Sequence, residues 1–229
     1  MSRIVDFILY ILKWPAALFL LFSAPALWQS FDHFNFLTAR FYALGGGIIV
    51  YVLTILIAGY DVCSNMQIIS HELTHTVFAY LTLHSAGRIR LNPDGSGGSM
   101  MIRKGMGNWI IALSPYFFPL FAAIYMIIMP ALLIMSGNHW LVYAVLGYFV
   151  AYYWATVISQ VHPKQTDIIG QGYVFSAIII ITLNLLTTGI LLAYTSQSWH
   201  GVDKYLNIVN KHNIQNLQNF ASLILQYFQ

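Results

Sequence analysis

Long apolar runs separated by short polar stretches dominate this chain of 229 residues. A helix needs about 20 consecutive apolar residues to cross a bilayer, and six stretches come close to or exceed that length. They cover residues 5–28, 41–60, 64–84, 107–135, 138–160 and 168–195. The pattern therefore predicts an all-α polytopic membrane protein with about six transmembrane helices.

Prolines mark the fourth apolar stretch as irregular. Pro115, Pro119 and Pro130 all fall inside residues 107–135. A proline cannot donate a backbone hydrogen bond, and its ring clashes with the preceding turn of a helix. We therefore expect this segment to be bent or broken.

Residues 86–105 have a different pattern, that of a short β-hairpin. Polar and apolar residues alternate over residues 88–91, turn-forming residues follow, and residues 99–104 can return as a second strand. The glycine-rich edge at Gly97, Gly98 and Ser99 could pair with an extended substrate peptide. The alternative is an ordinary loop between two helices.

The segment after the last long apolar run is amphipathic. Residues 198–229 are rich in Asn and Gln, with apolar residues at near-helical spacing. This predicts helices that lie on the membrane or pack on the protein. The chain then divides into N-terminal transmembrane helices at 1–60, a membrane core at 61–196 and a C-terminal amphipathic segment at 197–229.

Composition supports a membrane protein and excludes other classes. The chain is 59% hydrophobic and 7% charged, whereas a soluble domain carries about 25% charged residues. A lipid bilayer is therefore an expected partner. The net charge of +3 is too small and scattered to indicate nucleic acid binding. Cys63 is the only cysteine, so no intrachain disulfide can form.

The basic residues predict an orientation. Six spans would place the loop at 29–40, the hairpin and the loop at 161–167 on one side, with six Lys and Arg against three or four on the other. Since cytoplasmic loops are enriched in Lys and Arg, the hairpin side is expected to be cytoplasmic and both termini outside.

The most informative motif is HExxH, formed by His71, Glu72 and His75. Histidines at i and i+4 project from one face of a helix, where both can bind one zinc ion. Glu72 is the only glutamate in the chain and stands within a largely apolar segment. It is the candidate catalytic base, which takes a proton from a zinc-bound water.

A catalytic zinc site usually takes a third protein ligand. No second glutamate exists, which leaves Asp or His. Asp167 is favoured because it opens the last long apolar run, where an unpaired charge would be expensive. Asp94, within a turn sequence of the hairpin, and His162, in the preceding loop, remain alternatives.

The chain resembles the site-2 protease family of intramembrane zinc metalloproteases (peptidase family M50), in its compact bacterial form. The resemblance lies in an HExxH helix within the membrane, a glycine-rich hairpin after it and an aspartate further downstream. The resemblance covers about residues 60–190. It implies a three-segment core, with HExxH on 64–84 and the aspartate ligand on 168–195. It also implies Zn²⁺ as cofactor and a location in the bacterial cytoplasmic (inner) membrane.

The expected activity is hydrolysis of a peptide bond in or near a transmembrane segment of a substrate protein, by zinc-activated water. Asn184, within the last apolar stretch, could donate to an oxyanion or to the substrate backbone; a hydrogen bond between helices is the alternative. A regulatory membrane partner is also conceivable. The competing functions are a non-proteolytic metal-handling protein and a catalytically silent binder of transmembrane helices.

Overall fold

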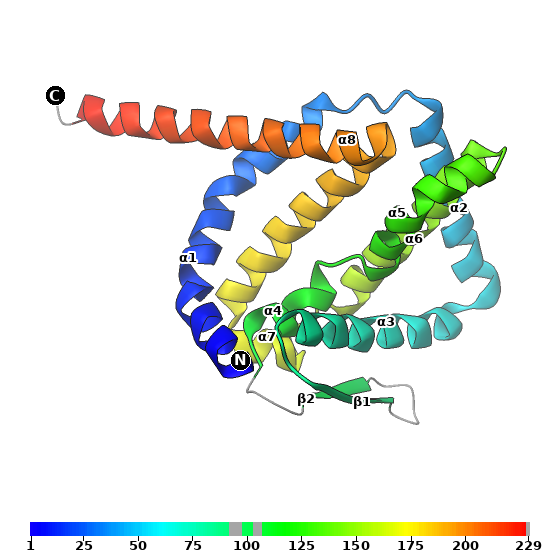
Figure 1. Ribbon diagram of the computed structural model, residues 1–229, viewed down its shortest axis with the longest axis horizontal. Helices are drawn as coiled ribbons and strands as arrows, with labels where there is room; N and C mark the ends of the chain where they lie inside the picture. The colour runs from blue at the N-terminus through cyan, green and yellow to red at the C-terminus, as the bar shows by residue number, and fades with distance from the viewer. Residues whose placement is uncertain (92–97, 103–106, 228–229) are drawn as a thin grey trace.

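The computed structural model describes residues 1–91, 98–102 and 107–227. Within these residues twelve elements follow one another: α1 (Ser2–Gln29), η1 (Ser30–His33), α2 (Ala39–Ala58), α3 (Tyr60–Leu81), β1 (Ala86–Leu91), β2 (Gly98–Ile102), α4 (Trp109–Leu113), η2 (Ser114–Tyr116), α5 (Leu120–Met135), α6 (His139–Gln160), α7 (Thr166–Gln171) and α8 (Tyr173–Tyr227). The described part of the chain is thus almost entirely helical (Figure 1).

Among the described residues, four helices are long and apolar enough to cross a membrane, and α4–η2 with α5 adds a fifth if this bent pair counts as one span. The long apolar helices indicate an integral membrane protein. The expectation of six spans is wrong, because α3 does not qualify among the residues described. Its mean hydropathy is lowered by buried polar residues, among them Gln67, Ser70 and Thr74. In Figure 1, α3 crosses the direction of the long helices.

The fourth apolar stretch is broken, as its prolines predict. The helices on either side of the break, Trp109–Tyr116 and Leu120–Met135, meet at 76°. Pro115 and Pro119 flank this bend, whereas Pro130 lies inside α5. The break sits beside α3, against which η2 packs.

Two short antiparallel strands follow α3. In their register Arg90 pairs with Ser99 and Leu91 with Gly98, and an irregularity falls between Ala86 and Ile89. Residues 92–97, which include the expected turn with Asp94 and Gly97, lie outside the described residues. The strands therefore place Gly98 and Ser99 at the start of β2, next to that turn.

Helices α2 and α6 pack closely against each other. A Cβ added to Gly47 would lie 1.7 Å from the backbone oxygen of Ala144, and one on Gly147 would lie 2.0 Å from that of Leu44. Small residues let helix backbones approach in membranes, where packing rather than water exclusion drives association. Around this contact lies the largest buried cluster, drawn from α2, α5, α6 and α8.

The long helix α8 changes direction at its non-helical residues Gln197 and Ser198, where the C-terminal segment was predicted to begin. Beyond them it runs across the end of the bundle (Figure 1). Its apolar residues remain exposed toward the C-terminus, including Leu217, Phe220 and Leu223. This arrangement suits the amphipathic character expected from the sequence.

The two ends of the bundle carry different loops. The N-terminus, the hairpin and α7 lie at one end, whereas η1 and the C-terminal part of α8 lie at the other (Figure 1). The loop at 29–40 therefore lies at the end away from the hairpin, and the N-terminus and the C-terminal part of α8 lie at opposite ends, unlike the predicted arrangement. Basic residues stand in elements of both ends, at Arg88 and Arg90 of β1 and at Lys204 and Lys211 of the C-terminal part of α8. A cytoplasmic hairpin end stays a prediction.

Candidate metal centre

The centre begins with one face of α3. His71 and His75 are one helical turn apart, and both are buried, at 8% and 7% exposure. Their Nε2 atoms lie 3.1 Å from each other. The i, i+4 spacing of the HExxH motif thus brings two imidazoles to one point inside the protein.

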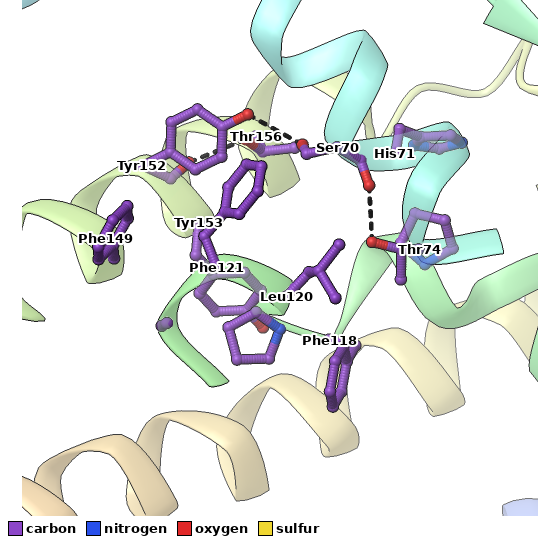
Figure 2. Close-up of a pocket in the computed structure, with 13 residues that line it drawn as sticks. Ser70, His71, Thr74, Phe118, Leu120, Phe121, Phe149, Tyr152, Tyr153 and Thr156 are labelled. Carbon is purple, nitrogen blue, oxygen red and sulfur yellow. Dashed lines mark hydrogen bonds between the residues drawn. The ribbon is translucent and has the colours of Figure 1, made fainter. Parts of the chain in front are cut away.

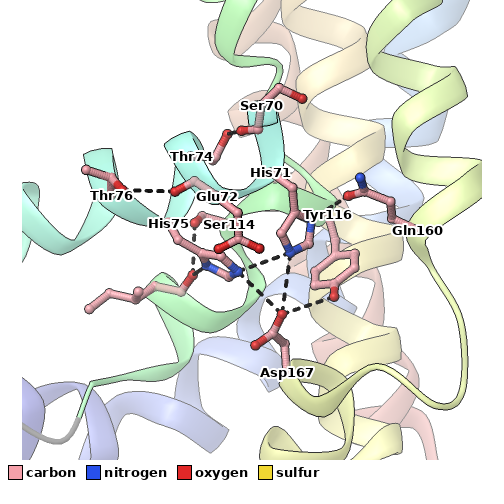
Figure 3. A network of polar contacts seen from close by, with 11 residues as sticks. Ser70, His71, Glu72, Thr74, His75, Thr76, Ser114, Tyr116, Gln160 and Asp167 are labelled. Atoms are coloured by element: carbon pink, nitrogen blue, oxygen red, sulfur yellow. Dashed lines mark hydrogen bonds and ion pairs between the residues drawn. The ribbon is translucent and has the colours of Figure 1, made fainter. Parts of the chain in front are cut away.

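Asp167 reaches the same point from α7. Its Oδ2 atom lies 3.5 Å from His71 Nε2 and 3.4 Å from His75 Nε2 (Figure 3). A tetrahedral zinc ion with ligand bonds of about 2.0–2.2 Å holds its ligand atoms roughly 3.3–3.5 Å apart. The spacing of these three atoms therefore fits a zinc ion, and this is the one such group of His, Cys, Asp or Glu among the residues described.

The other nitrogen of each imidazole is already engaged. His75 Nδ1 donates to the backbone oxygen of Ile111 at 2.7 Å, and His71 Nδ1 donates to Oε1 of Gln160. Since both acceptors are carbonyl oxygens, Nδ1 carries the hydrogen in each ring and Nε2 presents a lone pair. Two lone pairs and a carboxylate oxygen converge without a hydrogen between them, which is the donor set of a cation site.

Asp167 is oriented and kept ionised by its neighbours. The Tyr116 hydroxyl donates to its Oδ2 at 3.2 Å. Burial alone would raise the pKa of the Asp167 carboxyl, but protonated imidazoles at His71 and His75 would bond to it and attract it, which holds its pKa well below the usual range when no metal ion is bound. A carboxylate in this state is ready to bind a metal ion without first losing a proton.

Glu72 lies beside this group. Its side chain is 5% exposed, and in Figure 3 its carboxylate lies close to the two imidazole rings. The Thr76 hydroxyl donates to the backbone oxygen of Glu72 at 2.9 Å, which is a bond within the helix. The carboxylate thus stands near the position where a metal-bound water would be deprotonated.

The structure separates the candidate third ligands by position. Asp167 lies within the group, whereas His162 is exposed and its Nδ1 accepts from the backbone amide of Lys164. Asp94 lies outside the described residues. The geometry therefore favours Asp167 over His162.

Asn184, expected to contact substrate, lies elsewhere. It is buried in α8, and its amide nitrogen donates to the backbone oxygens of Tyr116 at 2.8 Å and Ile180 at 2.6 Å. These contacts match the alternative in which Asn184 links two helices. Its role in substrate binding, like that of Gly97, Gly98 and Ser99, stays a prediction.

A small pocket borders the centre. It is narrow, with a cavity volume of about 20 Å³, and Figure 2 shows Ser70 and Thr74 of α3 facing aromatic residues of α6 across it. Its wall also includes His71 and the broken segment between Pro115 and Ala122. Its lining is mostly apolar.

Sequence reasoning missed three groups that orient the ligands: Gln160, Tyr116 and the backbone oxygen of Ile111. Each is more than 30 residues from the ligand it contacts. Gln160 ends an apolar stretch and Tyr116 is one of 15 tyrosines, so neither position carries a local signal. Only Pro115 offered a signal in the sequence. It has no N–H, so the backbone oxygen of Ile111 lacks its usual backbone donor four residues later.

Comparison with known proteins agrees with this geometry. A family model described as peptidase M50B-like matches residues 42–162, just over half of the chain. The match includes HExxH and the broken segment but ends before Asp167. Neither the curated proteins nor the solved structures contain a significant match.

Proposed function

The chain belongs to the peptidase M50B-like family, and from this premise we propose that it is a zinc-dependent intramembrane metalloprotease. It would cut a peptide bond in or near a transmembrane segment of another membrane protein. The observation that carries the proposal is the convergence of His71, His75 and Asp167 on one point with Glu72 beside it.

In this proposal His71, His75 and Asp167 hold Zn²⁺, which would make a bound water acidic and polarise the scissile carbonyl. Glu72 accepts the proton from the water and later passes it to the leaving amine. Gln160 and the Ile111 carbonyl keep both imidazoles in the tautomer that binds metal.

The substrate would have to reach the centre in an extended form, because a helix hides its carbonyls in its own hydrogen bonds. The edge of the hairpin at Gly98 and Ser99 is the proposed place where such a peptide pairs. The bacterial cytoplasmic membrane is the proposed location, and a further membrane protein could regulate access.

A metal-handling protein is the weaker candidate. Transport across a bilayer needs successive ligand sets, whereas the described residues contain a single three-ligand group. Glu72 would have no role in such a protein. A catalytically silent binder of transmembrane helices would need neither Glu72 nor the three metal-binding side chains.

Glu72→Gln tests the proposal. The substitution keeps the size of the side chain and removes the base, so cleavage of a transmembrane substrate should fall by a factor of about 10²–10⁴. Zinc content should stay at the wild-type level, because Glu72 is not a ligand. Full cleavage by Glu72→Gln, with zinc retained, would refute the assignment.

A further inference from the structure

The break between η2 and α5 lies beside the metal centre and exposes backbone groups that a continuous helix would satisfy. Pro115 has no N–H, so the oxygen of Ile111 has no donor four residues later. In apolar surroundings an unpaired backbone group costs several kcal/mol, on the order of a lost hydrogen bond or more. Within the break, the Ser114 hydroxyl donates to the Ile111 oxygen at 3.0 Å, and further donors come from other elements.

Side chains from two other helices supply such donors. His75 of α3 donates to the Ile111 oxygen, Asn184 of α8 donates to the Tyr116 oxygen, and Thr187 of α8 donates to the Phe117 oxygen at 3.0 Å. The first of these bonds also fixes a metal ligand. The same break thus connects the metal centre to α8.

Asn184 is held by bonds at both ends of its amide. Its nitrogen donates to the oxygens of Tyr116 and Ile180, and its Oδ1 accepts from the Tyr153 hydroxyl. The side chain is 5% exposed. With all of these bonds made, Asn184 holds a single orientation and keeps the backbone at Tyr116 against α8.

Tyr116 carries this constraint to the ligands. Its backbone oxygen is bound by Asn184, while its hydroxyl donates to Asp167 Oδ2 at 3.2 Å. Its ring also packs edge-on against His71, with 5.2 Å between the ring centroids. A shift of the Tyr116 backbone would therefore move the donor away from the carboxylate.

We propose that Asn184 is a positioning residue of the metal centre, which acts through Tyr116 on Asp167. This inference rests on the proposed zinc site and assigns Asn184 a task within the protein, in place of contact with substrate.

Zinc affinity tests the inference without any substrate. Competition with a chromogenic chelator would be measured in detergent for the wild type, Asn184→Leu and Asn184→Ser. Leu removes all three side-chain bonds of Asn184. Ser can still bond to the Ile180 oxygen within the helix, but it loses the bond to the Tyr116 oxygen and the amide oxygen that accepts from Tyr153. Both variants should bind zinc about 3- to 10-fold more weakly, somewhat less than the loss of a group that touches a ligand directly.

Thr195→Val is the matched control. Thr195 is fully buried on the same helix, and its hydroxyl donates to the Leu191 oxygen of that helix. The control should keep wild-type zinc affinity. The unfolding temperature of the metal-free proteins reports general destabilisation separately, and Asn184→Ser remains available if Asn184→Leu does not fold.

A double-mutant cycle with Tyr116→Phe tests the path. If Asn184 acts through the Tyr116 hydroxyl, the double variant should bind zinc no more weakly than the weaker of the two single variants. If the losses of zinc affinity in the two single variants multiply in the double variant, the path through Tyr116 is overturned. If both Asn184 variants bind zinc with wild-type affinity, the positioning role is overturned. If the wild type itself bound no zinc, the proposed function would fail first, and this inference with it.

Discussion

At the scale of single residues, the geometry of the centre depends on which atom of each ligand side chain remains available to bind a metal ion. His71 and His75 use Nδ1 for carbonyl oxygens, which turns both Nε2 lone pairs toward Asp167. Tyr116 donates to the carboxylate from another side. The metal-binding geometry thus depends on neighbours that are not themselves ligands.

Gln160→Ala tests this dependence. Loss of the acceptor at His71 Nδ1 frees the ring to rotate and to change tautomer, so zinc affinity should fall about 10- to 100-fold. The measurement is chelator competition on the purified protein.

Ser159→Ala is the control for that variant. Ser159 stands next to Gln160 at the end of α6, but its hydroxyl donates to Gln67 and to the Thr156 oxygen, not to a ligand. We expect unchanged zinc affinity for Ser159→Ala. Equal affinity in both variants would mean that Gln160 does not orient His71.

At the scale of elements, the position of the centre depends on how helices approach one another. The α2–α6 contact through Gly47 and Gly147 fixes α6, whose last residue is Gln160. The break at Pro115 brings η2 to α3, and the short helix α7 brings Asp167 to both histidines. Each of these elements carries a group that the centre needs.

Gly47→Ala should destabilise the protein, because the added Cβ would meet the Ala144 oxygen at 1.7 Å and force the helices apart. Overpacking of this kind costs about 1–3 kcal/mol, which thermal unfolding in detergent would detect.

Gly45→Ala serves as the matched variant, since nothing lies within 4 Å of a Cβ at that position of the same helix. It should be neutral or slightly stabilising, by up to about 1 kcal/mol, because alanine favours helix over glycine. A similar loss of stability in both variants would contradict the close contact at Gly47.

At the scale of the whole molecule, the sequence predicts the local features best. The HExxH pair depends on helical spacing, and the break depends on prolines, so both could be recognised in the chain itself. Asp167 could be selected because a lone charge beside lipid is costly. Gln160 and Tyr116 could not, since their contacts join residues far apart in sequence.

The number of spans shows the limit of length as a criterion. Residues 64–84 are long enough to cross a bilayer, yet α3 carries several polar side chains. Neighbouring helices bury these side chains within the protein, so that they do not face lipid. That burial depends on the tertiary packing. The loops lie at other ends of the bundle than expected for the same reason, because a helix that does not cross the bundle changes the end at which the segments after it lie.

The most direct test of the account is the zinc content per chain, by elemental analysis, of detergent-purified wild type, Asp167→Ala and His162→Ala. With three protein ligands as in other catalytic zinc sites, we expect about one zinc in the wild type and in His162→Ala, and a large loss in Asp167→Ala. A wild type without zinc, or an Asp167→Ala variant that keeps it, would contradict the proposed centre.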